Sequence, residues 1–214
     1  MLESINKTKK KIILKAIYLY NQKGFFNVLN QEIAKASNVS LSNLNYHFPT
    51  KKDLIISVCG YMSYTLNKRI SENKLLINNA IILEMARIYL EFENEFKFFY
   101  LDTHNILKKY SLLDQEMGKQ IHEAIQMIKN LNYIAIGKGY MQPEPAEFKG
   151  AYDLLANKIW MTSHFWYVQA DFKKQKKDII KDGLISTYGL LYPYLTEKGV
   201  KQYLEYLKIL DIKI

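Results

Sequence analysis

The 214-residue sequence predicts an all-α protein, and three observations support this fold class. Apolar residues recur at steps of three and four along nearly the whole chain, as they do in helices with one buried face. The sequence contains no alternating run bounded by turns that would indicate a β-strand. Its hydrophobic content of 49% is ample for a packed core and excludes a disordered chain. We therefore expect helices joined by short turns.

The expected helices follow from this periodicity in order. The first covers residues 5–22 and ends at Gly24, which suits the left-handed backbone beyond a last turn. Two short helices follow, one holding Ile33 to Ala36 and one over 41–48, and a long helix covers 51–71. Later helices are expected over 78–100, 103–110, 113–139, 146–171, 175–192 and 197–210. Prolines at 143 and 145 separate the helices over 113–139 and 146–171.

Composition restricts the class of protein further. No apolar run is long enough to cross a bilayer, and the first residues lack the apolar segment of a signal peptide. Cys59 is the only cysteine, which excludes an intrachain disulfide and a cysteine-based zinc site. These features predict a cytoplasmic protein without a membrane partner.

Positive charge is concentrated near the N-terminus. The first 60 residues contain nine lysines and three acidic residues, so they carry +6 of the net charge of +9. A local basic excess favours a polyanionic partner, either nucleic acid or an anionic membrane surface. A generally lysine-rich proteome would explain the same excess, so charge does not decide between them.

The stretch from Asn30 to Leu54 indicates two short helices joined by a tight turn. Asn30 is expected to cap the first helix, and Asn38 to take the left-handed position after it. Val39 is the apolar residue of the turn, and Ser40 is expected to cap the second helix.

The second short helix has an apolar face and a polar face. Leu44 and Phe48, four residues apart, are expected to face inward, and the polar residues between them point elsewhere. Two short helices that share a small core form a helix-turn-helix, whose second helix enters the major groove of DNA. Asparagine matches the edge of adenine, and leucine methyls can meet a thymine methyl.

These residues resemble the N-terminal domain of TetR-type transcriptional regulators. The resemblance rests on Ile13–Phe25, Glu32–Ala36, Val39–Ser40, Asn43–Phe48 and Lys51–Leu54, in order and at fixed spacing over about residues 8–58. Beyond residue 60 only the general architecture is similar. The resemblance implies a helix-turn-helix DNA-binding domain over 1–50, a connecting helix over 51–71, and a helical ligand-binding and dimerisation domain over 72–214.

The sequence departs from the family pattern at several positions. Val28 and Leu29 stand where the family usually has Thr or Ser, and Asn38 replaces the frequent turn glycine. Ser42, Asn43 and Asn45 replace the frequent Gly, Thr and first Tyr of the second short helix. Because these last residues would read bases, the operator sequence does not follow from the resemblance.

The resemblance also implies roles for individual residues. Base-edge and nearby phosphate contacts are implied for Leu41, Ser42, Asn43 and Asn45, and phosphate contacts for Tyr46, His47 and Lys51. Tyr46 is equally compatible with a core aromatic, and His47 with a packed histidine. The lysines at 7, 9, 10 and 11 are expected either near the DNA backbone or on a solvated face.

The remainder of the chain is rich in aromatic residues. Within Lys158–Phe172 and Gly183–Leu195 we expect the two helices that pair across the dimer in this family, although both could pack inside one subunit. Gly183, Ser186 and Gly189 would allow close approach of helices. A pocket for an amphipathic ligand is predicted from Tyr100, His104, Trp160, His164 and Tyr167, and an ordinary aromatic core would explain the same residues.

Catalysis has little support in the sequence, so no enzyme, metal or cofactor is expected. His104 and His164 lack partners at metal-ligand spacing. Glu91, Glu93 and Glu95 alternate along a helix and are expected on a solvated face. Two hypotheses therefore remain. One is a homodimeric repressor on a near-palindromic operator, released by an unknown small amphipathic or lipophilic effector. The other is a helix-turn-helix protein with an architectural or cell-cycle role that acts through a protein partner.

Overall fold

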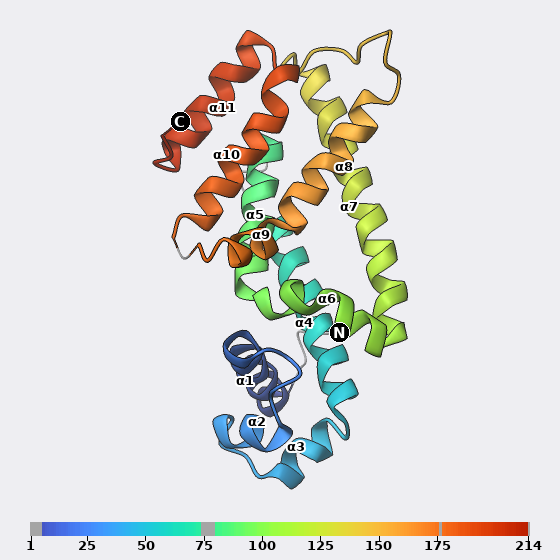
Figure 1. The fold of residues 1–214 in the computed structure, drawn as a ribbon, viewed down its shortest axis with the longest axis vertical. Coiled ribbons are helices and arrows are strands. Elements are labelled where there is room, and N and C mark those ends of the chain that lie inside the picture. The colour runs from blue at the N-terminus through green and yellow to red at the C-terminus, as the bar shows by residue number, and fades with distance from the viewer. Residues whose placement is uncertain (1–5, 74–79, 176, 214) are drawn as a thin grey trace. The chain divides into compact units, whose positions relative to one another are not determined.

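The structure is a computed structural model that describes residues 6–73, 80–175 and 177–213 (Figure 1). These residues form helices joined by turns, and the described segments contain no β-strand beyond an isolated bridge between Met141 and Leu195. The all-α prediction is therefore confirmed. The helices, in order, are α1 (Lys7–Lys23), α2 (Asn30–Ala36), α3 (Leu41–His47), α4 (Lys51–Glu72), α5 (Ile81–Glu95), α6 (Lys97–Lys109), α7 (Ser111–Gly137), α8 (Ala151–His164), α9 (Trp166–Phe172), α10 (Ile179–Leu191), the 3-10 helix η2 (Tyr192–Tyr194) and α11 (Glu197–Ile209).

The chain divides into two compact units. One consists of Met1–Arg69 with Glu95–Gln115, and the other of Ile70–Asn94 with Glu116–Ile214. The first unit therefore contains α6 as well as the short helices, so it is larger than the 1–50 segment that the sequence suggests.

Asn21 explains why α6 belongs to the first unit. Its side-chain amide donates to the Glu95 carbonyl at 2.7 Å and accepts from the Phe98 N–H at 3.0 Å. These two backbone groups lie where α5 ends and α6 begins, and helix ends leave such groups without partners inside the helix. The ring of Tyr20 also packs against that of Phe98, with centroids 5.2 Å apart. Asn21 and its neighbour thus attach α6 to α1.

Two of the expected helices are interrupted. The helix expected over 78–100 breaks at the fully buried Phe96, where α5 gives way to α6, and α6 absorbs the helix expected over 103–110. The helix expected over 146–171 begins only at Ala151 and breaks at Phe165, where α8 gives way to α9. The Glu144 carboxylate accepts from the N–H groups of Gly150 and Tyr152, both at 3.0 Å, and so caps the first turn. The segment between the helices expected over 51–71 and 78–100 lies largely outside the described residues.

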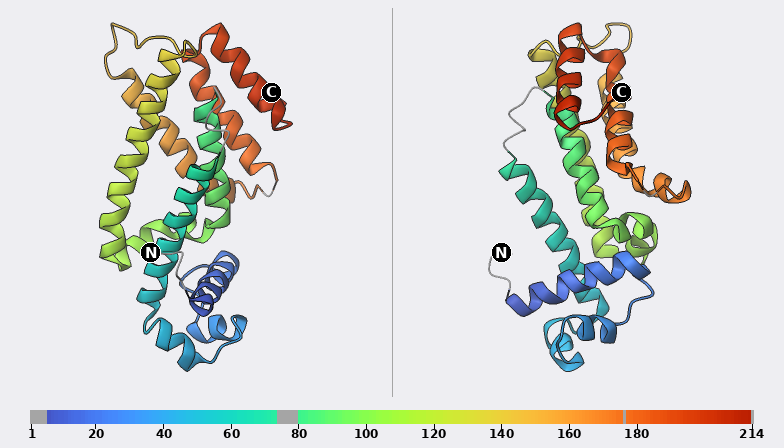
Figure 2. Two further views of the ribbon diagram at one scale, coloured as in Figure 1. Left: turned by 180° about the vertical axis from the view of Figure 1, so that it is seen from behind. Right: turned by 90° about the vertical axis from the view of Figure 1, so that its left-hand side faces the viewer.

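In the second unit α8 packs against α10, as Figure 2 shows. Gly183 lets α10 also lie close to α5, because a Cβ there would lie only 2.8 Å from a methyl carbon of Leu90 in α5. A separate buried network joins α5 to α11. In this network the Glu84 carboxylate accepts from the Arg87 guanidinium at 2.7 Å and from the hydroxyl of Tyr206. Gly183, expected at a dimer interface, therefore packs within its own subunit.

Candidate DNA-binding surface

The turn between α2 and α3 has the form that the sequence predicts. Asn38 adopts the left-handed region with φ 51°, and its N–H donates to the Lys35 carbonyl at 3.1 Å. The N–H of Val39 donates to the Ala34 carbonyl at 3.1 Å. These two bonds form a Schellman motif, which satisfies the last carbonyls of α2. The turn then leads directly into α3.

The start of α2 differs from the prediction. Asn30 is the first residue of the helix and not its cap, which is Leu29. A leucine side chain cannot accept a hydrogen bond, and the Glu32 carboxylate reaches back to accept from the Leu29 N–H at 2.9 Å. The other Glu32 oxygen lies 2.5 Å from the Lys23 ammonium of α1. These contacts hold the pKa of Glu32 below its usual value, the bond to the Leu29 backbone being the largest cause. Glu32 thus joins α2 to α1.

Helix α3 has one buried face and one exposed face. Ser40 caps the helix by accepting from the Asn43 N–H at 3.1 Å, as predicted. Leu44 is fully buried, and Phe48 just after the helix is also buried. The side chains of Ser42, Asn43 and Asn45 are exposed, whereas Leu41 is half-buried. The exposed face therefore presents hydroxyl and amide groups without a covering residue.

Tyr46 and His47 end this face. The Tyr46 side chain is 82% exposed, which excludes the alternative of a core aromatic. His47 is half-buried, and its ring lies between those of Tyr46 and Phe48, with centroids 5.2 and 6.5 Å away. Both residues belong to the last turn of α3.

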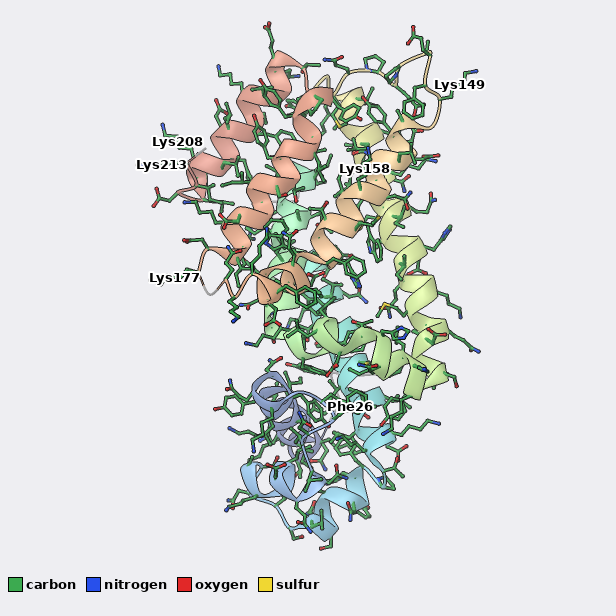
Figure 3. The ribbon with its side chains drawn as sticks, viewed as in Figure 1. Phe26, Lys149, Lys158, Lys177, Lys208 and Lys213 are labelled. Carbon is green, nitrogen blue, oxygen red and sulfur yellow. The ribbon has the colours of Figure 1, made fainter. Side chains whose placement is uncertain are left out.

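Lys51 opens α4 but turns its ammonium group toward the protein. Its Nζ donates to the Val28 carbonyl at 2.8 Å and lies 4.6 Å from the centre of the Phe25 ring. Burial, followed by the nearby charge of Lys109, lowers the pKa of Lys51. The Lys109 ammonium lies over the ring of Phe26, which belongs to the same loop between α1 and α2 as Phe25 and Val28. Phe26 is labelled in Figure 3. The loop between α1 and α2 is thereby held against both lysines.

Lys52 is a candidate that the sequence reasoning missed. Its side chain is exposed, whereas that of Lys51 is half-buried. Thr50 and Asp53 form a reciprocal cap, in which the Asp53 N–H donates to the Thr50 hydroxyl at 3.2 Å and the Thr50 N–H to the Asp53 carboxylate at 2.9 Å. The lysine pair was visible in the sequence, but which of the two faces solvent depends on the loop that binds Lys51.

Three of the five predicted ligand-site residues lie together in the second unit. The rings of Trp160 and His164 stack with centroids 4.7 Å apart, and His164 lies beside Glu93. Tyr167 is buried near the same carboxyl group, whose charge raises its pKa after the larger effect of burial. Tyr100 and the exposed His104 instead lie on α6, which belongs to the first unit.

Glu93 itself contradicts the expectation of a solvated acidic face. It is buried with 2% of its surface exposed, whereas Glu91 and Glu95 pair with Arg87 and Arg69. Residues from later helices pack on α5 and bury this carboxyl group. The alternation of acidic residues along α5 did not indicate that Glu93 would be buried.

The described segments contain no group of three His, Cys, Asp or Glu side chains that could hold a metal ion. None of their helices is long and apolar enough to cross a membrane.

The geometry of α2, the turn and α3 defines a helix-turn-helix DNA-binding protein, with α3 in the position of the recognition helix. Comparison with protein families gives two matches. Residues 12–58 match the N-terminal domain of the "Bacterial regulatory proteins, tetR family", and residues 65–203 match the "Bacterial transcriptional repressor" domain of TetR. The chain therefore belongs to the TetR family of transcriptional regulators, which is not a family of enzymes.

Two named relatives are similar in sequence. The chain is 25% identical to the negative transcriptional regulator IcaR of the biofilm operon icaADBC from Staphylococcus aureus, over 87% of this chain and 98% of that protein. It is 30% identical to the transcriptional regulator YerO from Bacillus subtilis over 142 residues, which cover 63% of this chain. That match spans about half of YerO (49%).

Solved structures share the fold. A TetR-family regulator from Marinobacter aquaeolei superimposes with a TM-score of 0.82 at 20% identity, covering 95% of this chain and 98% of that one. A protein from Saccharomonospora viridis described as a transcriptional regulator, in complex with choline, gives a TM-score of 0.71 at 14% identity, over 88% and 97% of the two chains.

Proposed function

We propose that this transcriptional regulator is a homodimeric repressor that binds a near-palindromic operator and is released by a small amphipathic or lipophilic ligand. The observation that carries the proposal is the exposed face of α3, on which Ser42, Asn43 and Asn45 lie uncovered. Repression is supported by the similarity over nearly the full length of IcaR, a negative regulator.

In this proposal different residues read the bases and hold the backbone. The amides of Asn43 and Asn45 offer the paired donor and acceptor that match an adenine edge, and Leu41 meets a thymine methyl group. Tyr46, His47 and the first turn of α4 contact phosphates. The ammonium of Lys51 is engaged with the Val28 carbonyl, so Lys51 contributes its backbone N–H and its positive charge at short range.

The test begins with selection of bound DNA from a random pool, which yields the preferred site. On that site Asn43→Ala or Asn45→Ala should cost about 1–3 kcal/mol, with little effect on random DNA. The control is Asn105→Ala, which removes an exposed amide on α6. If both α3 changes left the sequence preference intact, α3 would not be the reading helix.

Phosphate contacts have a separate signature. Affinity for DNA should fall steeply with salt, because each phosphate that a lysine neutralises contributes a slope of about −0.9 to the log–log plot. Lys52→Ala should reduce this slope by about one and weaken preferred and random DNA equally. A slope near zero for the parent protein would argue against a nucleic-acid partner.

Dimerisation is proposed through an exposed apolar face in the second unit. Leu154, Met161 and Phe165 are 48%, 55% and 52% exposed, and their spacing places them on one side of α8. Gly189 of α10 has open space around it, and Tyr192 beyond it is 55% exposed. A second copy of this chain would cover these surfaces and place two recognition helices on successive half-sites.

Sedimentation tests this interface. The parent protein should be a dimer both free and on DNA, and Met161→Asp should shift it toward monomer. The control is Ile209→Asp, which places the same charge on the exposed face of α11. A parent protein that is a monomer with and without DNA would contradict the proposal.

Ligand control is proposed to act through α4, which runs from Lys51 beside α3 to Glu72. At about 1.5 Å per residue this helix spans some 30 Å, and its last residues, Ile70–Glu72, belong to the second unit, so a change in its tilt is the proposed link. The coupling must be reciprocal, so the ligand and the operator weaken each other by the same factor. A bulky change at Met62 or Leu66 should alter that factor.

Thermal melting against a panel of lipophilic compounds tests whether such a ligand exists, since a ligand of the folded state raises the midpoint. The choline complex of the protein from Saccharomonospora viridis shows that this fold can hold a small molecule. No shift across the panel, with specific DNA binding intact, would favour a protein partner instead.

A further inference from the structure

The buried carboxyl group of Glu93 in α5 lacks a charged partner. One oxygen, Oε1, lies 4.0 Å from Nδ1 of His164, and the other, Oε2, is buried without any hydrogen-bond partner. Buried carboxylates in proteins are normally paired with a cation or with several donors. The nearest arginine along α5, Arg87, is occupied by Glu84 and Glu91. Within the described residues, no lysine or arginine forms an ion pair with Glu93.

Aromatic side chains surround this group. Tyr89 of α5 and Tyr167 of α9 both lie close enough to Glu93 for its charge to raise their pKa values, after the larger effect of burial. The hydroxyl of Tyr167 is itself buried without a partner. On α8 the ring of Trp160 stacks on that of His164, beside the carboxyl group. The cluster therefore combines one acid with the faces and edges of several rings.

The burial of the Glu93 carboxyl group does not stabilise the fold. Burial raises the pKa of Glu93 well above its ordinary value, because it penalises the charged carboxylate. Burial also lowers the pKa of His164 to about 4, so the imidazole is neutral and does not compensate an ionised Glu93. A buried acid with an unused oxygen is destabilising for the fold, and such groups are commonly kept for function.

We infer that Glu93 recognises the charge of the effector, and that the effector is a lipophilic organic cation such as a tertiary amine or quaternary ammonium compound. The inference rests on the proposed control of this regulator by a small molecule. A cation of this kind loses little hydration on burial, pairs with a carboxylate and is attracted to aromatic faces. An anion would form no ion pair with this carboxyl group and would oppose its ionisation. A metal ion would need further ligands, which the described segments do not supply around Glu93.

Because burial favours the protonated form of Glu93, binding of the cation is expected to displace a proton from it. The titratable groups that face it are Tyr89 on α5, His164 on α8 and Tyr167 on α9, and none of these three changes charge between about pH 6 and pH 8. Calorimetry in buffers of different ionisation enthalpy should therefore show release of up to about one proton per bound cation.

A matched pair of probes separates charge from shape. Benzyltrimethylammonium is the cation, and neopentylbenzene is its neutral isostere, in which carbon replaces the quaternary nitrogen. Both tryptophans of the chain, Trp160 and Trp166, lie in α8 and α9, so intrinsic fluorescence reports binding near the cluster without DNA. The full-length protein should bind the cation at least about tenfold more tightly than the isostere.

Two variants on the same helix provide the decisive comparison. Glu93→Gln keeps the shape and removes the charge, and it should abolish both the preference for the cation and the release of a proton. Glu91→Gln makes the same change two residues away, where the carboxylate pairs with Arg87 and is 41% exposed, and it should retain both. Circular dichroism confirms that each variant is folded.

Each outcome has a separate meaning. Equal binding of the two probes, binding of neither, or an unchanged preference in Glu93→Gln would overturn the assignment of Glu93. These measurements use no DNA, so their failure leaves the DNA-binding proposal intact. Conversely, failure to select a preferred operator would remove the proposed function while leaving the binding of cations to be judged by fluorescence alone.

Discussion

Asn21 bridges α1 and the α5–α6 junction, so its replacement is expected to destabilise the protein mainly at that junction. Asn21→Ala removes one donor and one acceptor, so the Glu95 carbonyl and the Phe98 N–H lose their partners at 2.7 and 3.0 Å. Each partly buried bond of this kind contributes about 0.5–1.5 kcal/mol, and two such bonds are lost. The change should therefore cost about 1–3 kcal/mol. The matched control is Asn27→Ala, whose amide makes one exposed bond to the Lys23 carbonyl at 2.8 Å and should cost less than about 0.5 kcal/mol.

Hydrogen exchange measured by mass spectrometry localises the effect. Peptides from the start of α6 should exchange about 5–150-fold faster in Asn21→Ala, because that factor corresponds to 1–3 kcal/mol of easier opening. Peptides from α10 and α11 should exchange as in the parent protein, since they belong to the other unit. If α6 exchanged equally in Asn21→Ala and Asn27→Ala, Asn21 would not be what attaches α6 to α1.

Three further predictions concern stability. Gly199→Ala should cost more than about 2 kcal/mol in urea unfolding, because its Cβ would lie 2.0 Å from the backbone oxygen of Tyr140, whereas Gly118→Ala, with open space in α7, should be neutral or stabilising by up to about 1 kcal/mol. Asn38→Val should lower the melting temperature by forcing a branched residue to φ 51°, and Asn38→Gly should not. The raised pKa of Glu93 makes its contribution to stability greatest below about pH 4.5 and smaller as pH rises, so the melting temperature of Glu93→Gln should gain on the parent between about pH 5 and pH 8. A constant difference across that range would show that Glu93 is not held protonated.

The helix-turn-helix was predictable because its geometry depends on neighbours in sequence. Asn38 adopts the left-handed conformation because α2 must end there, and Ser40 caps α3 because its hydroxyl reaches an N–H three residues later. The inward positions of Leu44 and Phe48 follow from helical spacing alone. Local hydrogen bonds and periodicity act over three or four residues, and the sequence displays them directly.

Contacts between segments far apart in the sequence determined which charged side chains are buried, and the sequence alone did not indicate this. The ammonium of Lys51 turns inward because a loop more than twenty residues earlier presents the Val28 carbonyl and the Phe25 ring. Glu93 is buried because α8 and α9 pack on α5, although its acidic neighbours are exposed or paired. By itself the sequence determined the all-α fold and the exposed polar face of α3. Only the tertiary structure decided which charges lie inside, because burial depends on what folds back against a residue and not on the residues beside it.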